Sequence, residues 1–355
     1  QDYLNPKFTR VYNKENLPID VIISPEIEIA KSIQRKLEAP GALDSVPFAN
    51  NKIRLLEILI NENCKLSNIK LNDLTKKYPN LDANIIGIIR DEKFIIPKKN
   101  DHVQKNDKIY VIINSSQMSE TLEVFGHDEK ISKNILIVGG GNIGFNLAKE
   151  LEESNSQISI TIIESSEDRS SYIADHLKKT LVLYGDGLDQ SILDEANVSE
   201  ADIMLALTND DETNIITSAV ARKNNCKSLI LINNSEYSNL KDVLGIDRII
   251  DPRMITASQI LKHVHKGKIE SVYSISNNQG EIIHAQALKN SKLINTALKD
   301  LSMPNGIRIG IICRDGKISI PDKDTIIQED DDVIFISLLK SIRKAEDLFQ
   351  VSEIY

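Results

Sequence analysis

The stretch Asn134-Ile-Leu-Ile-Val-Gly-Gly-Gly-Asn-Ile-Gly144 decides the fold. It joins a short aliphatic run, 134–138, to the pattern G-x-G-x-x-G that ends at Gly144. Aliphatic runs of this length form parallel strands that are buried on both faces. The residues that follow, 143–153, place apolar side chains on one helical face. The stretch therefore predicts a strand, a glycine turn and a helix in succession.

The glycine turn and a later acidic residue predict a phosphate-binding site. Gly139 permits a tight turn, Gly141 lets the backbone approach a pyrophosphate, and Gly144 lets the helix pack closely on the strand. The start of the helix offers free N–H groups and a partial positive charge. We predict that the loop contacts a dinucleotide through Gly139, Gly140, Gly141, Asn142, Ile143 and Gly144. The alternative is a glycine turn that binds nothing.

Glu164 supports the dinucleotide interpretation. It ends the next apolar run, Ile158–Ile163, at the position that the fingerprint requires. A carboxylate there would accept hydrogen bonds from the adenosine ribose and repel a 2′-phosphate. The sequence therefore favours NAD(H) over NADP(H).

Two polar stretches follow the third and fourth predicted strands, where such sheets bind ligands. Gly185-Asp186-Gly187 follows a strand near 180–184, and Thr208-Asn209 follows a strand near 202–207. Asp186 would meet the adenine, with Gly187 beside it as a further cofactor-binding residue, and Thr208 and Asn209 would meet the phosphate or the second ribose. A polar turn at Asp186 and a helix N-cap at Asn209 or Asp210 are the alternatives.

The segment 132–251 alternates strands and helices throughout. A further strand is expected near 228–232, and helices are expected near 167–178, 189–196 and 211–224. This alternation predicts an α/β fold, a Rossmann-like doubly wound parallel sheet. Another amphipathic helix is expected over 252–266, with an apolar stripe of Ala257, Ile260, Leu261 and Val264. It precedes short strands near 271–276, 282–288, 307–312 and 333–337, which predict a small α+β domain.

The chain contains a long repeat. Leu17-Pro-Ile-Asp-Val-Ile-Ile-Ser-Pro25 corresponds to Leu244-Gly-Ile-Asp-Arg-Ile-Ile-Asp-Pro252, and Arg90-Asp-Glu-Lys-Phe-Ile-Ile-Pro97 to Arg314-Asp-Gly-Lys-Ile-Ser-Ile-Pro321. The order of features is the same in both copies, so we expect a duplicated two-domain unit rather than a solenoid. The segment 46–115 is then the twin of 270–340. The glycine motif of the first copy is not in this chain, so we expect the chain to be a fragment that begins inside the first copy.

Composition excludes several classes of protein. The chain has 355 residues, of which 41% are hydrophobic and 27% charged, and a formal net charge of −9. An acidic chain without a Lys/Arg block is a poor nucleic-acid binder, so no nucleic-acid partner is expected. Cys64, Cys226 and Cys313 form no CxxC pair, which indicates a reducing compartment and no metal site. The apolar runs are far shorter than the roughly 20 residues of a membrane span, so we expect a cytoplasmic location.

These motifs together resemble a known family. The sequences GGGNIG at 139–144, GDG at 185–187 and ALTNDDE at 206–212 resemble the KTN, or RCK N, domain of Trk-type potassium uptake regulators. The pair RDEKFIIP and RDGKISIP resembles their RCK C domain. Members of the family often have an Arg at the end of the fifth strand, whereas this chain has Asn233 and Asn234.

The resemblance implies an organisation of N–C–N–C domains. It assigns 1–30 to the remnant of a first RCK N domain and 31–118 to the first RCK C domain. It assigns 132–251 to the second RCK N domain, and 252–355 to a crossover helix with the second RCK C domain.

The resemblance also implies a function. The chain would be a regulatory subunit that binds NAD(H), with ATP or ADP as other occupants, and gates a TrkH/TrkG-type potassium-translocating membrane subunit. It would form a homo-tetramer at the cytoplasmic face of the inner membrane. The alternative is an NAD-dependent oxidoreductase, which needs an acid/base residue against the nicotinamide. Because no His, Lys or Tyr stands out for that role, we expect no enzymatic activity and no catalytic residue.

Overall fold

The computed structural model describes residues 22–66, 69–154, 157–238, 241–264, 269–275, 279–289 and 291–349. These residues form two compact units. The parallel-sheet unit combines the described residues up to Leu37 with Ser132–Ala257, and the antiparallel unit combines Glu38–Ile131 with the residues from Ser258 on. The predicted remnant 1–30 lies largely outside the described residues.

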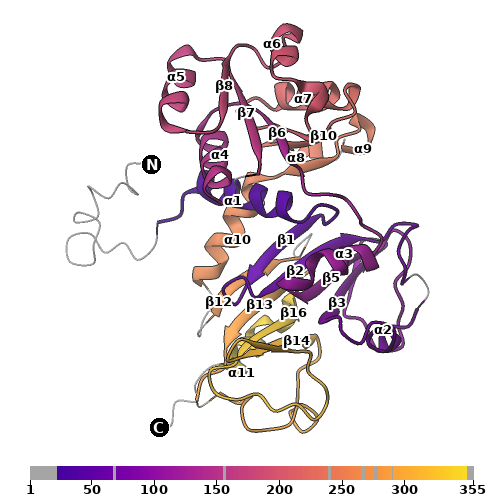
Figure 1. Ribbon diagram of the computed structural model, residues 1–355. Coiled ribbons are helices and arrows are strands. Elements are labelled where there is room, and N and C mark those ends of the chain that lie inside the picture. Colours follow the sequence, from indigo (N-terminus) through magenta and orange to yellow (C-terminus); the bar gives the residue numbers. More distant parts are fainter. Residues whose placement is uncertain are drawn as a thin grey trace, which may run out of the picture. The chain divides into compact units, whose positions relative to one another are not determined.

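The parallel-sheet unit is a doubly wound α/β fold, as predicted (Figure 1). Its strands are β6 (Asn134–Val138), β7 (Ser159–Glu164), β8 (Leu181–Tyr184), β9 (Ile203–Ala206), β10 (Lys227–Leu231) and β11 (Arg248–Ile250). They are parallel and lie in the order β11-β10-β9-β6-β7-β8. From β6 the chain winds outward to β8, and from β9 it winds outward to β11 on the other side, so the winding direction reverses between β6 and β9.

Helices connect the strands of this sheet. They are α4 (Asn142–Ser154), α5 (Glu167–His176), α6 (Gln190–Glu195), α7 (Asp211–Lys223), α8 (Ser235–Ser238) and α9 (Lys241–Leu244), with a 3-10 turn η4 (Val198–Glu200). Strand β11 was not predicted, because three residues are too few to show a hydrophobic period.

Helix α1 (Pro25–Glu38) belongs to this unit. It buries Ile29, Ile33 and Leu37 in one hydrophobic core with strand residues such as Ile135 and Leu205. The helix runs across the boundary between 30 and 31 that the family resemblance implied. A segment from the first copy of the repeat therefore covers the sheet of the second copy.

Helix α10 (Pro252–Val264) is the counterpart of α1 in the repeat, because Pro25 and Pro252 begin the two helices. Ile255 packs against the core of the parallel sheet, whereas Ile260 is 51% exposed. Of the predicted apolar stripe Ala257, Ile260, Leu261 and Val264, the last two side chains lie outside the described residues.

The antiparallel unit contains two sheets of the same design. The first has β1 (Asp44–Phe48), β2 (Ile53–Leu59), β3 (Ala83–Arg90), β4 (Lys93–Ile95) and β5 (Lys108–Asn114). The second has β12 (Ile269–Ser274), β13 (Gly280–Gln286), β14 (Ile307–Arg314), β15 (Lys317–Ser319) and β16 (Asp332–Leu338). Their orders, β1-β2-β5-β3-β4 and β12-β13-β16-β14-β15, are equivalent. The register even shifts at matching places, between Ile85 and Gly87 and between Ile309 and Ile311.

Short helices complete the two small domains. The first holds α2 (Leu71–Lys77), η3 (Ser115–Gln117) and α3 (Met118–Val124), and the second holds η6 (Leu339–Ser341) and α11 (Ile342–Phe349). One hydrophobic core joins both sheets, with Ile86 and Ile112 from the first and Ile311 and Ile334 from the second. Within this unit the Asn84 amide donates to the Gly310 carbonyl at 2.6 Å. The two small domains therefore form one body.

Each small domain contains the same ion pair between a buried aspartate and a partly exposed arginine. Arg90 Nε and a terminal nitrogen bond the two oxygens of Asp107 at 2.8 and 2.7 Å, and the Gln104 N–H donates to the same carboxylate. Arg314 Nε and a terminal nitrogen donate to the two oxygens of Asp331, both at 2.7 Å. The Gln328 N–H donates to the same carboxylate, as the Gln104 N–H does to Asp107. The hydrogen bonds that Arg90 and Arg314 donate to the carboxylates of Asp107 and Asp331 raise the pKa of each arginine above the ordinary value. Both arginines therefore stay charged.

Candidate functional site

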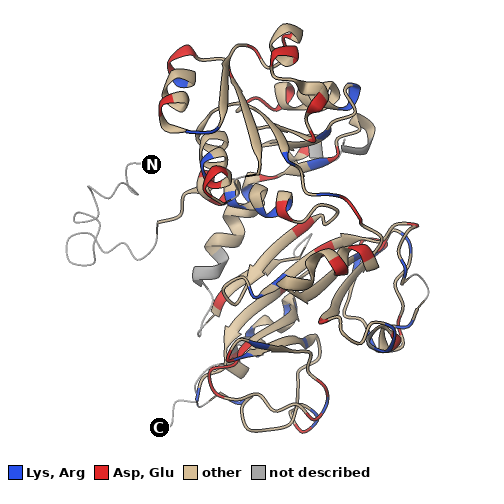
Figure 2. Ribbon diagram, in the orientation of Figure 1, with Lys and Arg blue, Asp and Glu red and all other residues tan. Residues whose placement is uncertain are grey.

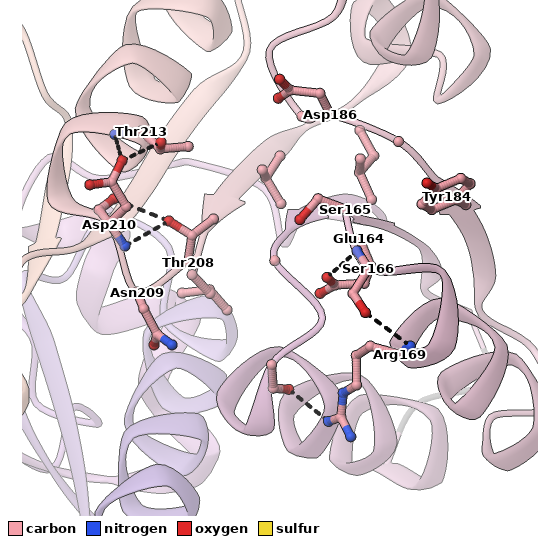
Figure 3. A pocket seen from close by; sticks show the side chains of 17 residues that line it. Glu164, Ser165, Ser166, Arg169, Tyr184, Asp186, Thr208, Asn209, Asp210 and Thr213 are labelled. Carbon is pink, nitrogen blue, oxygen red and sulfur yellow. Dashed lines mark hydrogen bonds between the residues drawn. The ribbon is translucent and has the colours of Figure 1, made fainter.

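A cavity of about 760 Å³ opens at the carboxyl ends of β6, β7, β8 and β9 (Figure 3). It lies at the point where the winding direction of the sheet reverses, which is where open α/β sheets bind ligands. The lining comprises Val138, Gly139, Gly141, Ile163, Glu164, Ser165, Ser166, Arg169, Tyr184, Gly185, Asp186, Gly187, Leu207, Thr208, Asn209, Asp210 and Thr213.

The glycines of the turn have three different roles. Gly139 has φ +105°, and a Cβ there would lie 2.9 Å from the Thr208 backbone nitrogen. A Cβ on Gly144 would lie 2.2 Å from the Gly139 carbonyl oxygen, so the helix can approach the strand only without a side chain. A Cβ on Gly141 would meet nothing within 4 Å. Gly141 therefore faces open space at the cavity, whereas Gly139 and Gly144 are required by the fold.

Glu164 ties the end of β7 to the glycine turn. One carboxylate oxygen accepts from the Gly140 N–H and the other from the Ser166 N–H, both at 2.8 Å. Because a carboxylate has about four acceptor positions, each oxygen retains one for a hydroxyl group in the cavity. The carboxylate is thus held in one orientation at the cavity wall.

The predicted residues after β8 and β9 are partly engaged in local structure. Asp186 accepts from the Leu188 N–H at 2.9 Å, which makes it a polar turn as well as a lining residue. Thr208 is bound at its N–H and hydroxyl by Asn214 Oδ1, at 3.1 and 2.7 Å. The Thr208 hydroxyl therefore holds the loop in place and does not donate freely to a ligand.

Asp210, not Asn209, caps helix α7. Its side chain accepts from the Thr213 N–H at 2.9 Å. Asn209 is exposed and lines the cavity, and Figure 3 shows its side chain on the same loop as that of Thr208. The N-cap alternative thus applies to Asp210.

The structure brings most of the predicted residues to one cavity. Those that line it are Gly139, Gly141, Glu164, Asp186, Gly187, Thr208 and Asn209. The others, Gly140, Asn142, Ile143 and Gly144, build the turn and the start of α4 without lining the cavity. The binding role of each of these residues stays a prediction.

Sequence reasoning missed Arg169 and Tyr184. Arg169 carries the only Lys or Arg charge among the lining residues, against the carboxylates of Glu164, Asp186 and Asp210. Tyr184 ends β8 and is 57% exposed at the cavity. The sequence does show that Arg169 falls in the first turn of the helix after Glu164. Whether its side chain points into the cavity, however, depends on how that helix packs.

Three negative findings apply to the described residues. They contain no group of three or more His, Cys, Asp or Glu side chains that could hold a metal ion. Within them, no helix is both long enough and apolar enough to cross a membrane. Burial raises the pKa of Cys226 to about 12, so this thiol stays protonated and unreactive near neutral pH.

The parallel sheet, the glycine turn and the cavity define a Rossmann-type nucleotide-binding class of domain, paired here with two small antiparallel domains. Residues 135–252 match the TrkA-N domain model, and residues 55–126 and 286–350 match the TrkA-C domain model. The chain belongs to the family of Trk system potassium uptake proteins TrkA.

Two curated relatives illustrate the similarity. The Trk system potassium uptake protein TrkA of Azorhizobium caulinodans is 39% identical over 353 residues, covering 99% of this chain and 77% of the relative. That of Haemophilus influenzae is 33% identical over 359 residues, covering 100% of this chain and 78% of the relative.

Solved structures share the fold. The GsuK RCK domain has a TM-score of 0.54 at 16% identity, covering 97% of this chain and 73% of that chain. The GsuK channel bound to NAD has a TM-score of 0.51 at 15% identity, covering 96% of this chain and 61% of that chain. The likeness to both establishes the RCK architecture of this chain.

Proposed function

We propose that this chain is a regulatory subunit of a Trk-type potassium uptake system and that it responds to a nucleotide in the cavity of the parallel-sheet unit. Membership of the TrkA family supports the transport role. The observation that carries the nucleotide role is the open space at Gly141, beside the start of α4. Backbone N–H groups at a helix start bind phosphate.

The nucleotide that fits the lining best is NAD(H). The cavity has the volume of a small-molecule site, and Glu164 presents oriented carboxylate oxygens to a ribose. Its acidic side chains, Glu164, Asp186 and Asp210, outnumber the single cation Arg169 among the lining residues. This balance disfavours ATP, which carries more negative charge than NAD(H), and it disfavours the 2′-phosphate of NADP(H).

We expect the variant E164Q to weaken NADH binding about tenfold, because a ribose hydroxyl would lose a hydrogen bond to a charged acceptor. The amide nitrogen of Gln also cannot accept from the Gly140 or the Ser166 N–H, so part of the loss would come from a less firmly held loop. NADPH should be weakened less, since the repulsion of its 2′-phosphate disappears. Calorimetry of the wild type and of E164Q with both nucleotides measures these two losses of affinity. E195Q, on an exposed part of α6 away from the cavity, is the control. An unchanged NADH affinity in E164Q, with unaltered thermal stability, would remove Glu164 from the site.

The function we propose is non-enzymatic. Hydride transfer needs a substrate pocket against the nicotinamide and an acid/base group. The lining contains no His, Lys or Cys, and its one phenol, Tyr184, is more than half exposed. Incubation with NAD(H) should therefore change thermal stability without any net oxidation or reduction of the nucleotide.

The proposed partner is a TrkH/TrkG-type potassium-translocating membrane subunit, contacted at the cytoplasmic face of the inner membrane. The net charge of −9 disfavours direct attraction to anionic lipid. In Figure 2, acidic and basic residues are interspersed along the described elements of both units. Protein contacts, rather than lipid contacts, would then bring the chain to the membrane.

We propose that α10 takes part in assembly into a homo-tetramer. Its counterpart α1 buries an apolar stripe on a parallel sheet, whereas α10 leaves Ile260 of its predicted stripe about half exposed. A matching sheet from another part of the assembly would cover this stripe. I260D should reduce the mass measured by light scattering, whereas E195Q should not. The same mass for I260D and the wild type would place the interface elsewhere.

A further inference from the structure

Arg169 contacts the backbone of the glycine turn. Its Nε donates to the Gly140 carbonyl at 2.8 Å, and a terminal nitrogen donates to the Gly141 carbonyl at 3.2 Å. Figure 3 shows this side chain beside Glu164 and Ser166, with its guanidinium directed at a carbonyl oxygen. The guanidinium thus bridges two successive peptide groups of the loop that would meet a pyrophosphate.

The direction of these carbonyls fixes the direction of two N–H groups. In a trans peptide, the carbonyl and the N–H of the same planar unit point in opposite directions. The Gly140 carbonyl shares its plane with the Gly141 N–H, and the Gly141 carbonyl shares its plane with the Asn142 N–H. Arg169 holds the Gly140 carbonyl, and it shares the Gly141 carbonyl with the Phe145 N–H of α4, which donates to it at 3.0 Å. Both N–H groups therefore point away from Arg169, at the start of α4.

Aromatic side chains fix the guanidinium itself. Its central carbon lies 5.4 Å from the ring centroid of Phe145 and 5.0 Å from that of Tyr172. The two rings contact each other at 5.7 Å between centroids. A planar guanidinium can stack on these rings and donate through two nitrogens at once, whereas a lysine ammonium cannot reproduce this geometry.

We propose that Arg169 is the positioning residue of the nucleotide site: it orients the glycine turn so that the N–H groups of Gly141 and Asn142 meet the ligand's pyrophosphate. The inference rests on the proposed function, because it assumes a dinucleotide in the cavity. Arg169 would act on the ligand through the backbone N–H groups that it orients, rather than through its own charge. Its effect should therefore be confined to ligands that carry a diphosphate.

The test compares R169M and R169K with the wild type on three ligands. Calorimetry measures NADH and ADP-ribose, and ligand-observed NMR measures adenosine, which lacks the diphosphate. R253M removes a guanidinium of the same unit that does not line the cavity, so it serves as the matched control. Thermal unfolding of each ligand-free variant checks that the fold is retained.

We expect R169M and R169K to weaken ADP-ribose and NADH at least tenfold and adenosine less than twofold. If R169K bound ADP-ribose and NADH with wild-type affinity, only a positive charge would be needed at this position, and the positioning role would be overturned. An equal loss for adenosine and ADP-ribose would also overturn it, since Arg169 would then act on the whole site. Failure of the wild type to bind any of the three ligands would instead contradict the proposed function.

Discussion

G141V should abolish NADH binding while leaving the thermal unfolding of the protein almost unchanged. Nothing lies within 4 Å of the position of a Cβ on Gly141, and its φ is not positive, so a side chain fits the empty site without strain. A valine there would occupy the space that a pyrophosphate needs against the start of α4. We expect the affinity to fall at least a hundredfold, and calorimetry with a parallel thermal scan measures both quantities.

G144A is the matched comparison, because this substitution in the same motif should lower the stability of the fold, which G141V should leave unchanged. A Cβ at Gly144 would lie 2.2 Å from the Gly139 carbonyl oxygen, so the backbone must move. Overpacking of this kind costs about 1–3 kcal/mol of folding free energy or more. G144A should therefore lower the unfolding midpoint. Wild-type NADH affinity in G141V would show that the ligand does not approach Gly141, and the site would have to be placed elsewhere.

D331A should produce the largest loss of stability in the antiparallel unit. Asp331 is fully buried and accepts from Arg314 twice and from the Gln328 N–H. Removing one member of a buried pair typically costs about 3–5 kcal/mol, and we expect the lower end, because Arg314 is 39% exposed and can turn to water. Amide hydrogen exchange in β14 and β16 should accelerate roughly a hundredfold.

Two variants sharpen this prediction. D107A removes the equivalent pair with Arg90 and should accelerate exchange mainly in β3 and β5. D324A removes an exposed pair with Lys299 and should change little, since surface pairs contribute about 0–1 kcal/mol. Equal exchange in D331A and D324A would mean that the repeated Arg–Asp pair does not stabilise the sheets.

Much of the architecture could be predicted from the sequence because its signals are local. The strand at 134–138 was predicted with the bounds that the structure gives, and the helix after it within a residue at each end. The repeat predicted two small domains of one design, and the matching register shifts near Ile86 and Gly310 confirm it. Aliphatic strands and turn motifs determine these features within a few residues of chain.

The remaining features depend on contacts between distant segments. No local pattern shows that α1 packs on the sheet of the second copy, because its amphipathic face fits any apolar surface. Likewise, no local pattern shows that the Thr208 hydroxyl donates to the side chain of Asn214, six residues further along the chain. Arg169 reaches Gly140 and Gly141 only because α5 packs beside the glycine turn.

The regulatory mechanism follows from linkage. A nucleotide shifts the conformation of the assembly only by its difference in affinity for the two states, typically about 1–3 kcal/mol per coupled site. Several sites in one assembly would add to a larger bias. A variant that loses the nucleotide but keeps its fold, such as G141V, should therefore lose regulation and keep its contact with the membrane subunit.

The most direct measurement is potassium flux in vesicles that contain the membrane subunit and this protein, with and without NADH. We expect NADH to change the flux with the wild type and to have no effect on the flux with G141V, although G141V binds the membrane subunit equally well. Flux that is the same with and without NADH for the wild-type complex would contradict regulation through the cavity.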